Sequence, residues 1–133
     1  MREILFRGKT YDDEWVEGNL FIPDKKDTPT QICIGTNIVR ISYDVIPETV
    51  GQYTGLTDKN GTKIFEGDIL RVTDDNGETN LCSCGVGYVL FYYGVWYICD
   101  EVNDGLYDVN NIYYIEVIGN IHDNPELLKG GAE

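Results

Sequence analysis

Basic side chains are scarce in this sequence. The 133 residues contain 10 Lys and Arg against 23 Asp and Glu, which gives a formal net charge of −13 at pH 7. Between Arg71 and Lys129 there is no Lys or Arg at all. Proteins that bind nucleic acid directly neutralise phosphates with clustered Lys and Arg, so this composition argues against direct nucleic-acid binding.

Long apolar segments are also missing. No run approaches the roughly 20 apolar residues that a membrane-spanning helix needs. The opening residues, MREI, start polar and are not followed by the apolar region of a secretory signal. We therefore expect no membrane association and a cytoplasmic location, in which thiols stay reduced.

Residues for nucleophilic catalysis are few. There is one histidine, His122, and there are two serines, and no catalytic signature surrounds any of them. Two acidic pairs, Glu66 with Asp68 and Asp74 with Asp75, lie in predicted turns, where carboxylates commonly accept backbone hydrogen bonds. No phosphate-binding glycine motif is present. We expect a protein that is not an enzyme and that has no cofactor.

The cysteines do not form a recognisable framework. A disulfide between Cys82 and Cys84 would close a very small ring. The same pair with Cys99 and His122 matches the usual zinc-ligand spacing only weakly. We interpret these residues and Cys33 as free thiols and expect no metal site. Metal binding by Cys82, Cys84 and Cys99 is the alternative that the sequence leaves open.

Core-forming residues, in contrast, are plentiful: 42% of the chain is hydrophobic and 12% is aromatic. Short β-branched and aromatic runs are interrupted every few residues by turn formers, which predicts a mainly β fold. We expect residues 104–111 to form a loop or one short helix, and residues 124–128 (NPELL) to begin a short C-terminal helix. The predicted strands cover residues 4–6, 15–22, 31–36, 38–42, 45–46, 50–56, 63–65, 69–73, 86–93, 95–98 and 113–121.

Glycines mark the predicted turns. Asn60 and Gly61 suit the two positive φ angles of a type I′ hairpin turn. Gly55 and Gly67 are expected to supply positive φ or close approach of the backbone. Asp68 is expected to accept backbone N–H groups in the turn that it closes. We predict that these five residues specify the fold.

The acidic charge is concentrated in one part of the sequence. Two interpretations are open: a solvated face that keeps the protein soluble, or a negative field that attracts a basic partner. The acids of the base-free segment, residues 72–128, are Asp74, Asp75, Glu78, Asp100, Glu101, Asp104, Asp108, Glu116, Asp123 and Glu126.

Three separated blocks carry a family resemblance. They are residues 1–8 (MREILFRG), residues 52–61 continuing through 64–70 (QYTGLTDKNG and IFEGDIL), and residues 116–128 (EVIGNIHDNPELL). These blocks resemble the YopX-like family, small proteins carried largely by phages and prophages. The resemblance implies a mixed N-terminal β region joined to a small SH3-like barrel, in a bacterial host cytoplasm. It implies no catalytic residues.

These observations together predict one compact unit. Residues 1–49 form an N-terminal β region and residues 50–133 a barrel-like region that ends in a helical turn. We expect a non-enzymatic protein-interaction module that is also able to self-associate, with a bacterial host protein as the first partner to seek. The alternative is an acidic decoy that competes with DNA for a host nucleic-acid-binding protein. The candidate interaction surface comprises Tyr88, Tyr92, Trp96, Asp100, Glu101, Asp104 and Asp108.

Overall fold

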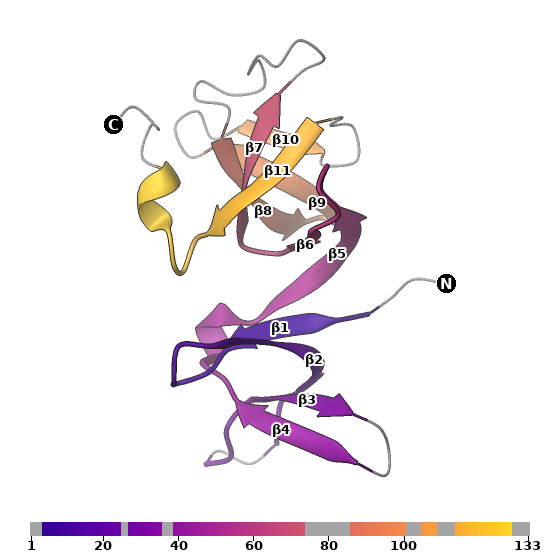
Figure 1. Cartoon of the computed structure of the whole chain (residues 1–133), viewed down its shortest axis with the longest axis vertical. Coiled ribbons are helices and arrows are strands. Elements are labelled where there is room, and N and C mark those ends of the chain that lie inside the picture. Colours follow the sequence, from indigo (N-terminus) through magenta and orange to yellow (C-terminus); the bar gives the residue numbers. More distant parts are fainter. Residues whose placement is uncertain are drawn as a thin grey trace. The chain divides into compact units, whose positions relative to one another are not determined.

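Extended strands make up most of the secondary structure (Figure 1). The computed structural model describes residues 4–24, 27–35, 39–73, 86–100, 105–108 and 114–128. The elements are β1 (Phe6–Lys9), β2 (Trp15–Phe21), β3 (Gln31–Gly35), β4 (Arg40–Asp44), the 3-10 helix η1 (Pro47–Thr49), β5 (Gly51–Thr57), β6 (Lys63–Phe65), β7 (Asp68–Thr73), β8 (Val86–Tyr92), β9 (Val95–Asp100), β10 (Gly105–Asp108), β11 (Tyr114–Asn120) and the 3-10 helix η3 (Pro125–Leu128). The prediction of a mainly β fold is confirmed.

The chain divides into two units, Met1–Gly55 and Leu56–Glu133, which are described separately below. The division between Gly55 and Leu56 falls within β5. The hydrogen-bonded order of one sheet is β4-β3-β2-β1-β5-β6, and that of the other is β10-β9-β8-β7-β11. Every strand pair with a defined register is antiparallel.

Two expected elements differ in the structure. Residues 105–108 form strand β10, which pairs with β9 from Gly105 opposite Asp100, instead of a loop or helix. Backbone pairing with a neighbouring strand decides this conformation, and the short LYD run gives no periodicity from which to foresee it. The C-terminal helix is a single 3-10 turn. The Asn124 side chain accepts the Asn120 N–H at 3.3 Å, and the Leu127 N–H bonds to the Asn124 carbonyl at 3.1 Å in the i to i+3 pattern of that turn.

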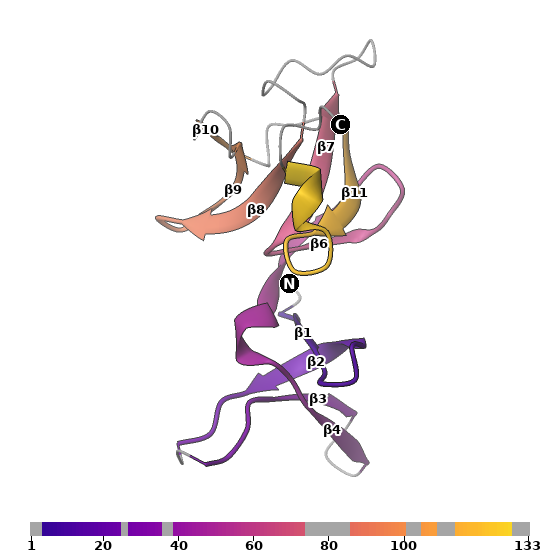
Figure 2. The ribbon, with the colours of Figure 1, turned by 90° about the vertical axis from the view of Figure 1, so that its left-hand side faces the viewer.

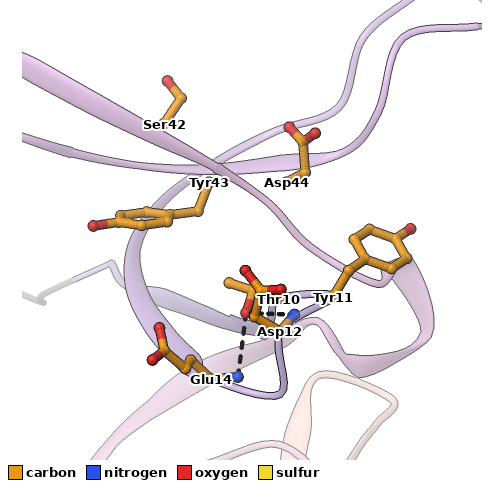
Figure 3. Close-up of a pocket in the computed structure, with 7 residues that line it drawn as sticks. All are labelled: Thr10, Tyr11, Asp12, Glu14, Ser42, Tyr43 and Asp44. Carbon is orange, nitrogen blue, oxygen red and sulfur yellow. Dashed lines mark hydrogen bonds between the residues drawn. The ribbon is translucent and has the colours of Figure 1, made fainter.

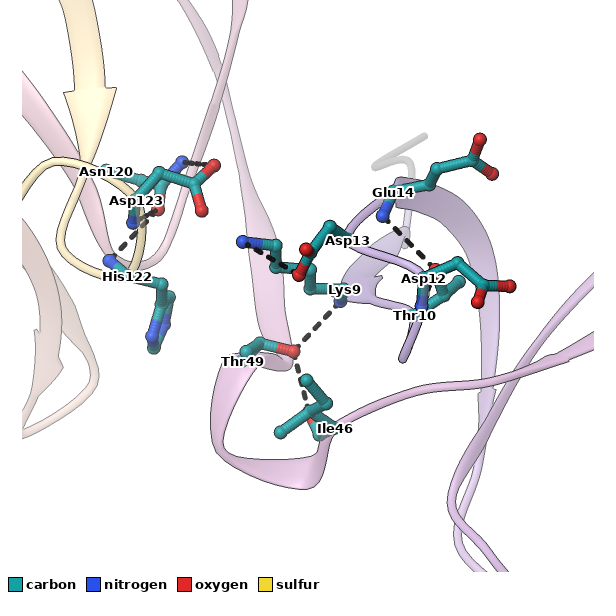
Figure 4. Close-up of polar contacts among 10 residues, drawn as sticks. All are labelled: Lys9, Thr10, Asp12, Asp13, Glu14, Ile46, Thr49, Asn120, His122 and Asp123. Atoms are coloured by element: carbon teal, nitrogen blue, oxygen red, sulfur yellow. Dashed lines mark hydrogen bonds and ion pairs between the residues drawn. The ribbon is translucent and has the colours of Figure 1, made fainter.

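The Met1–Gly55 unit is centred on two fully buried side chains, Ile32 and Val45. Beyond the end of β4, Val45 forms an isolated antiparallel bridge with Thr10 at the end of β1. The Thr49 hydroxyl ties η1 to β1, since it donates to the Ile46 carbonyl at 2.6 Å and accepts the Lys9 N–H at 2.9 Å (Figure 4). Backbone and hydroxyl contacts thus connect the segment that follows β4 to the end of β1.

The Leu56–Glu133 unit contains two hydrophobic clusters. The larger one consists of Ile64, Leu70, Val72, Val89, Ile98 and Ile115. The smaller one consists of Ile69, Val86 and Leu128. Consecutive residues of β7 therefore belong to different clusters, as expected for a strand that is buried on both faces.

The second sheet is open. Among the described strands, β10 has only β9 as a neighbour and β11 has only β7, so no pair closes the order β10-β9-β8-β7-β11 into a ring. The expected SH3-like barrel is therefore not confirmed. Closure depends on long-range pairing between the first and last strands, which no local sequence pattern encodes.

The turns show positive φ at three of the glycines that were predicted to occupy them. Gly55, Gly61 and Gly67 have φ of 90°, 84° and 92°. Asp68 is buried, and its carboxylate accepts the Phe65 N–H at 2.8 Å. The type I′ assignment is wrong, because Asn60 is not among the described residues with positive φ.

The structure also shows why the turn takes another form. The Asp58 carbonyl accepts the Gly61 N–H at 3.0 Å, and the Asp58 N–H bonds to the Thr62 carbonyl at 2.8 Å. The Asp58 side chain in addition accepts the Asn60 N–H at 2.9 Å. Asp58, two residues before Asn60, therefore favours a turn in which only Gly61 takes the left-handed conformation.

Strand β11 contains a β-bulge. Its register with β7 runs Val117 opposite Leu70, then Gly119 opposite Ile69, so Ile118 is an extra residue. Val117 packs against the larger cluster and Ile118 against the smaller one. The bulge thus lets one short strand supply side chains to both clusters.

Candidate functional site

The end of the β8–β9 hairpin is the strongest candidate interaction site. The register pairs Tyr92 with Val95, so only Tyr93 and Gly94 connect the two strands. Their φ angles, 50° and 81°, are both positive, as a type I′ turn requires. Figure 2 shows this link at the free end of the hairpin, away from β7 and β11.

Three consecutive aromatic side chains are exposed at this end. The exposed fractions are 52% for Phe91, 46% for Tyr92 and 87% for Tyr93. A tyrosine with positive φ costs about 1–3 kcal/mol of backbone strain, whereas Asn or Gly would fit the turn at little cost. The structure thus holds a large aromatic ring in solvent at a position that local backbone energetics disfavours.

Aromatic contacts organise the hairpin end on both of its faces. Phe91 lies opposite Trp96 with ring centroids 4.7 Å apart. The Tyr92 ring meets the Tyr93 ring edge-on at 4.4 Å and the Tyr97 ring at 6.2 Å. Because side chains alternate along a strand, the Phe91–Trp96 pair and the Tyr92–Tyr97 pair lie on opposite faces. The hairpin end therefore presents rings in several directions.

The predicted surface residues do not lie on one face. Tyr88 and Tyr92 share one face of β8, but Tyr88 is half-buried against the smaller cluster. Trp96 belongs to the opposite face and packs against the larger cluster. Only Tyr92 of these three is a well-exposed aromatic.

The structure describes only some of the acidic residues predicted for this surface. Asp100 ends β9, and Asp108 ends β10 in register with Tyr97. Glu101 and Asp104 lie outside the described residues, as do Cys82 and Cys84. Cys33 and Cys99 are free thiols, the first half-buried and the second buried.

Phe91, Tyr93 and Tyr97 belong to this candidate site in addition to the residues predicted from the sequence. The signal that would have found them is the two-residue turn, because a Tyr93-Gly94 link fixes the register. That register places Phe91 across from Trp96 and leaves Tyr93 at the tip.

A second feature is an open hollow of about 380 Å³ in the Met1–Gly55 unit (Figure 3). One side is the β1–β2 turn, in which the Thr10 hydroxyl accepts the N–H groups of Asp12 at 3.3 Å and Glu14 at 3.2 Å. The opposite side is the last part of β4. The hollow is lined by Thr10, Tyr11, Asp12, Glu14, Ser42, Tyr43 and Asp44.

The hollow is acidic and rich in hydroxyl groups. Its lining contains three carboxylates and no Lys, Arg or His. Over the described part of the chain, no group of three or more His, Cys, Asp or Glu side chains is arranged to hold a metal ion. The chemistry of the hollow therefore suits a cationic or hydrogen-bonding group.

Asp58 has a clearly perturbed pKa. Burial acts to raise its pKa, but backbone N–H groups of Val117, Thr62 and Asn60 bond to the carboxylate and bring the pKa below its ordinary value. These distances are 2.9, 2.8 and 2.9 Å. Since all three donors are backbone groups of turns and strands, Asp58 is a structural residue.

His122 belongs to a local turn network that Figure 4 also shows. Its N–H donates to the Asn120 side-chain oxygen at 3.0 Å, and the Asp123 N–H donates to the same oxygen at 2.9 Å. Asn120 is buried, and its amide group lies 3.4 Å from the Asp123 carboxylate. His122 thus lies in a backbone turn that Asn120 holds in place.

The fold defines a small, mainly β protein built from two antiparallel sheets. In the described part of the chain, no helix has the length and apolar character needed to cross a bilayer. A comparison with protein families matches residues 5–129 to the family described as YopX protein. The chain belongs to the YopX family, as its sequence blocks predicted.

The solved structures include a similar protein. The crystal structure of protein EF1440 from Enterococcus faecalis matches with a TM-score of 0.57 and 28% sequence identity. The match covers 97% of this chain and 100% of that chain. No curated protein matches this sequence.

Proposed function

We propose that this YopX-family protein is a non-enzymatic protein-interaction module whose binding element is the end of the β8–β9 hairpin. The carrying observation is the run Phe91-Tyr92-Tyr93, exposed at a hairpin end with rings on both faces. Exposed aromatic clusters mark interaction sites, because rigid rings bury a large area at a small cost in side-chain entropy. Strain at Tyr93 supports the proposal, since a turn selected only for stability would favour Asn.

Charge specifies the kind of partner. Residues 56–133 carry 4 Lys and Arg against 14 Asp and Glu, a net charge of −10. Such a field speeds the approach of a positively charged surface. Exposed Tyr rings also bind Lys and Arg by cation–π contact. The partner in this proposal is therefore a protein with a basic surface, in the bacterial cytoplasm expected for a phage- or prophage-borne protein.

Affinity capture tests the proposal. The immobilised protein is exposed to an extract of the bacterium that encodes it, beside a Phe91→Ser/Tyr93→Ser variant. Tyr11→Ser is the matched control, because Tyr11 is 65% exposed and lies in the other unit. We expect a basic protein to be retained by the parent and by Tyr11→Ser, to be lost with the double variant, and to be released as salt rises. Retention of the same proteins by all three would overturn the proposal.

The acidic decoy is the second candidate, and the base-free segment of residues 72–128 supports it. In that case the captured partner is a nucleic-acid-binding protein, and duplex DNA competes with this chain for it. Adding duplex DNA to the captured complex distinguishes the two. Displacement supports the decoy, whereas a partner that stays bound in excess DNA contradicts it.

A further inference from the structure

The acidic hollow beside β4 has walls that the fold holds in place. Val45, directly after β4, forms a bridge with Thr10 in the β1–β2 turn. The Ile46 N–H bonds to the Lys9 carbonyl at 2.8 Å, and within the turn the Thr10 N–H bonds to the Glu14 carbonyl at 2.8 Å. The turn is therefore fastened to the end of β4, and the hollow between them is preformed. A preformed site loses little affinity to the ordering of its own backbone.

The carboxylates of the hollow have no basic partner within the described chain. Asp12, Glu14 and Asp44 are exposed, and none of them makes an ion pair with a Lys or Arg of the residues that the structure describes. The Gln31 amide donates to Asp44 at 2.8 Å, which leaves further acceptor positions on that carboxylate. Negative charges that gather on one concave surface without neutralisation attract a cation.

The arrangement of these carboxylates suits a large cation better than a metal ion. In the described part of the chain, they do not form a group that converges on a metal position. They are spread instead around a hollow of about 380 Å³, near the lower end of the range for small-ligand sites. A guanidinium group distributes its charge over a plane with five N–H donors, so it reaches acceptors that lie apart, whereas an ammonium group is a point charge.

An aromatic ring completes one side of the hollow. Figure 3 shows Tyr43 and Glu14 on that side and Asp44 and Tyr11 on the other, with Asp12 between them. Tyr43 is half-buried, so its ring is held more firmly than that of Tyr11, which is 65% exposed. Guanidinium groups stack on tyrosine faces by cation–π contact. Tyr43 is therefore the ring on which a guanidinium group can stack.

Thr10 adds a buried hydrogen-bond donor to the lining. Thr10 is only 7% exposed, and its hydroxyl oxygen accepts the N–H groups of Asp12 and Glu14. These two bonds use both lone pairs of the oxygen, and the hydroxyl proton still needs an acceptor. Among the described residues none supplies one. Because a buried donor without an acceptor costs stability, the site favours a ligand that also brings a carbonyl oxygen.

We propose that the acidic hollow binds the side chain of an arginine residue in another polypeptide. The guanidinium group stacks on Tyr43 and donates hydrogen bonds to the three carboxylates of the hollow. A backbone carbonyl next to the arginine accepts the Thr10 hydroxyl proton, which a guanidinium compound without a carbonyl leaves unpaired. Because the carboxylates are exposed and their attraction is weakened by water, a single arginine should bind with a dissociation constant on the order of 1 mM.

A ligand series tests this chemistry on the full-length protein. N-acetyl-arginine N-methylamide is titrated in low salt while NMR follows the backbone amides of Asp12, Glu14 and Asp44. Its citrulline counterpart is the neutral isostere, its lysine counterpart is the point charge, and propylguanidinium is the side chain without a carbonyl. We expect saturable shifts with the arginine compound, at least about fivefold weaker binding of the lysine compound and propylguanidinium, and no saturation with the citrulline compound.

Each comparison in the series has an outcome that overturns part of the proposal. Equal binding of the citrulline compound would show that the hollow does not select a cation. Equal binding of the lysine compound would refute the preference for a guanidinium group. Equal binding of propylguanidinium would refute the contact with Thr10 and make a free guanidinium compound the ligand.

Variants locate the binding site. Asp44→Asn keeps the shape of an exposed side chain and removes one charge, and Tyr43→Leu removes the ring. Each should weaken binding of the arginine compound at least about threefold. The matched controls are Tyr43→Phe, which keeps the ring, and Asp24→Asn, which changes an exposed acid outside the hollow; both should bind within about twofold of the parent. Affinity like that of the parent in both Asp44→Asn and Tyr43→Leu overturns the proposal.

This site does not depend on the function proposed for the aromatic hairpin. Phe91 and Tyr93 are in the other unit, so Phe91→Ser/Tyr93→Ser should bind the arginine compound like the parent. A millimolar site does not retain a protein on a column by itself, so failure of the hollow and failure of capture by the hairpin are distinguishable. Loss of arginine binding in the hairpin variant, with Asp44→Asn unaffected, would place the arginine site at the hairpin and refute the assignment to the hollow.

Discussion

The carboxylate of Asp58 accepts a hydrogen bond from the backbone N–H of Val117 at 2.9 Å, across 59 residues of sequence. The same carboxylate accepts the N–H groups of Asn60 and Thr62 within its own turn. The Lys59 N–H adds a backbone bond to the Ile115 carbonyl at 3.0 Å. One side chain thus shapes the β5–β6 turn and fastens it to β11.

Replacing this carboxylate tests its contribution. Asp58→Asn keeps the size of the side chain but loses the charge that strengthens three N–H bonds, and its NH2 group replaces one accepting oxygen and cannot accept from the N–H donor that faces it. We expect the free energy of unfolding to fall by about 1.5–3 kcal/mol, measured by urea denaturation at pH 7. Asp24→Asn, a change at an exposed acid, should alter it by less than about 0.5 kcal/mol. Equal effects of the two variants would contradict the assignment.

The same residue predicts a pH dependence. The folded-state pKa of Asp58 lies below its ordinary value of 3.8, because the backbone hydrogen bonds favour the charged form over the effect of burial. A lowered pKa contributes stability that is complete above the unfolded-state pKa and disappears as pH falls through the folded-state pKa. The stability difference between the parent and Asp58→Asn should therefore narrow below about pH 4. A difference that stays constant down to pH 2 would be inconsistent with this account.

A contrasting prediction concerns the ion pair between Arg71 and Glu116. These residues are direct partners in the β7–β11 register, and their charged groups lie 3.9 Å apart. Both side chains are substantially solvent-exposed, at 52% and 36%. Glu116→Gln should therefore change the unfolding free energy by less than about 1 kcal/mol in low salt, and by less still in 0.5 M NaCl. A larger, salt-independent loss in urea denaturation would show that the pair is not screened.

Substitution of Tyr93 should change stability and partner binding in opposite directions. Tyr93→Asn relieves the strain of a tyrosine with positive φ and creates the Asn-Gly pair that type I′ turns prefer. We expect thermal denaturation to report a gain of about 0.5–1 kcal/mol, with the lost Tyr92 ring contact offsetting part of the relief. Capture of the basic partner should weaken at the same time. Tyr93→Ala loses the ring without gaining a turn former, and a more stable Ala variant than Asn variant would refute the strain argument.

Sequence patterns predicted the parts of the fold that depend on local chemistry. Alternating apolar residues located most strands, and the φ angles of Gly55, Gly61 and Gly67 followed from the need for positive φ in tight turns. Strand β10 was missed because its four residues are held by pairing with β9. Whether a sheet closes also depends on contacts distant in sequence, which periodicity does not report. The 3-10 form of η3 is fixed by local hydrogen bonds of Asn120, Asn124 and Leu127, which periodicity does not report either.

The candidate site was predicted only in outline. Aromatic density pointed to the hairpin that the proposed function uses, but treating Tyr88, Tyr92 and Trp96 as one surface ignored the alternation that puts Trp96 on the opposite face. The Asp58–Val117 bond could not be foreseen at all, because a hydrogen bond spanning 59 residues leaves no periodic trace.

The extra residue in β11, Ile118, restricts insertions and deletions in that strand more than it restricts which apolar residues the strand contains. Because Val117 and Ile118 serve different clusters, substituting either one by another apolar residue disturbs a single cluster. Deleting Ile118 would instead remove both the bulge and the side chain that packs against the smaller cluster, so that the strand could no longer supply residues to both clusters at this point. Relatives of this protein should therefore vary freely in which apolar residues occupy this segment, yet show no insertions or deletions there.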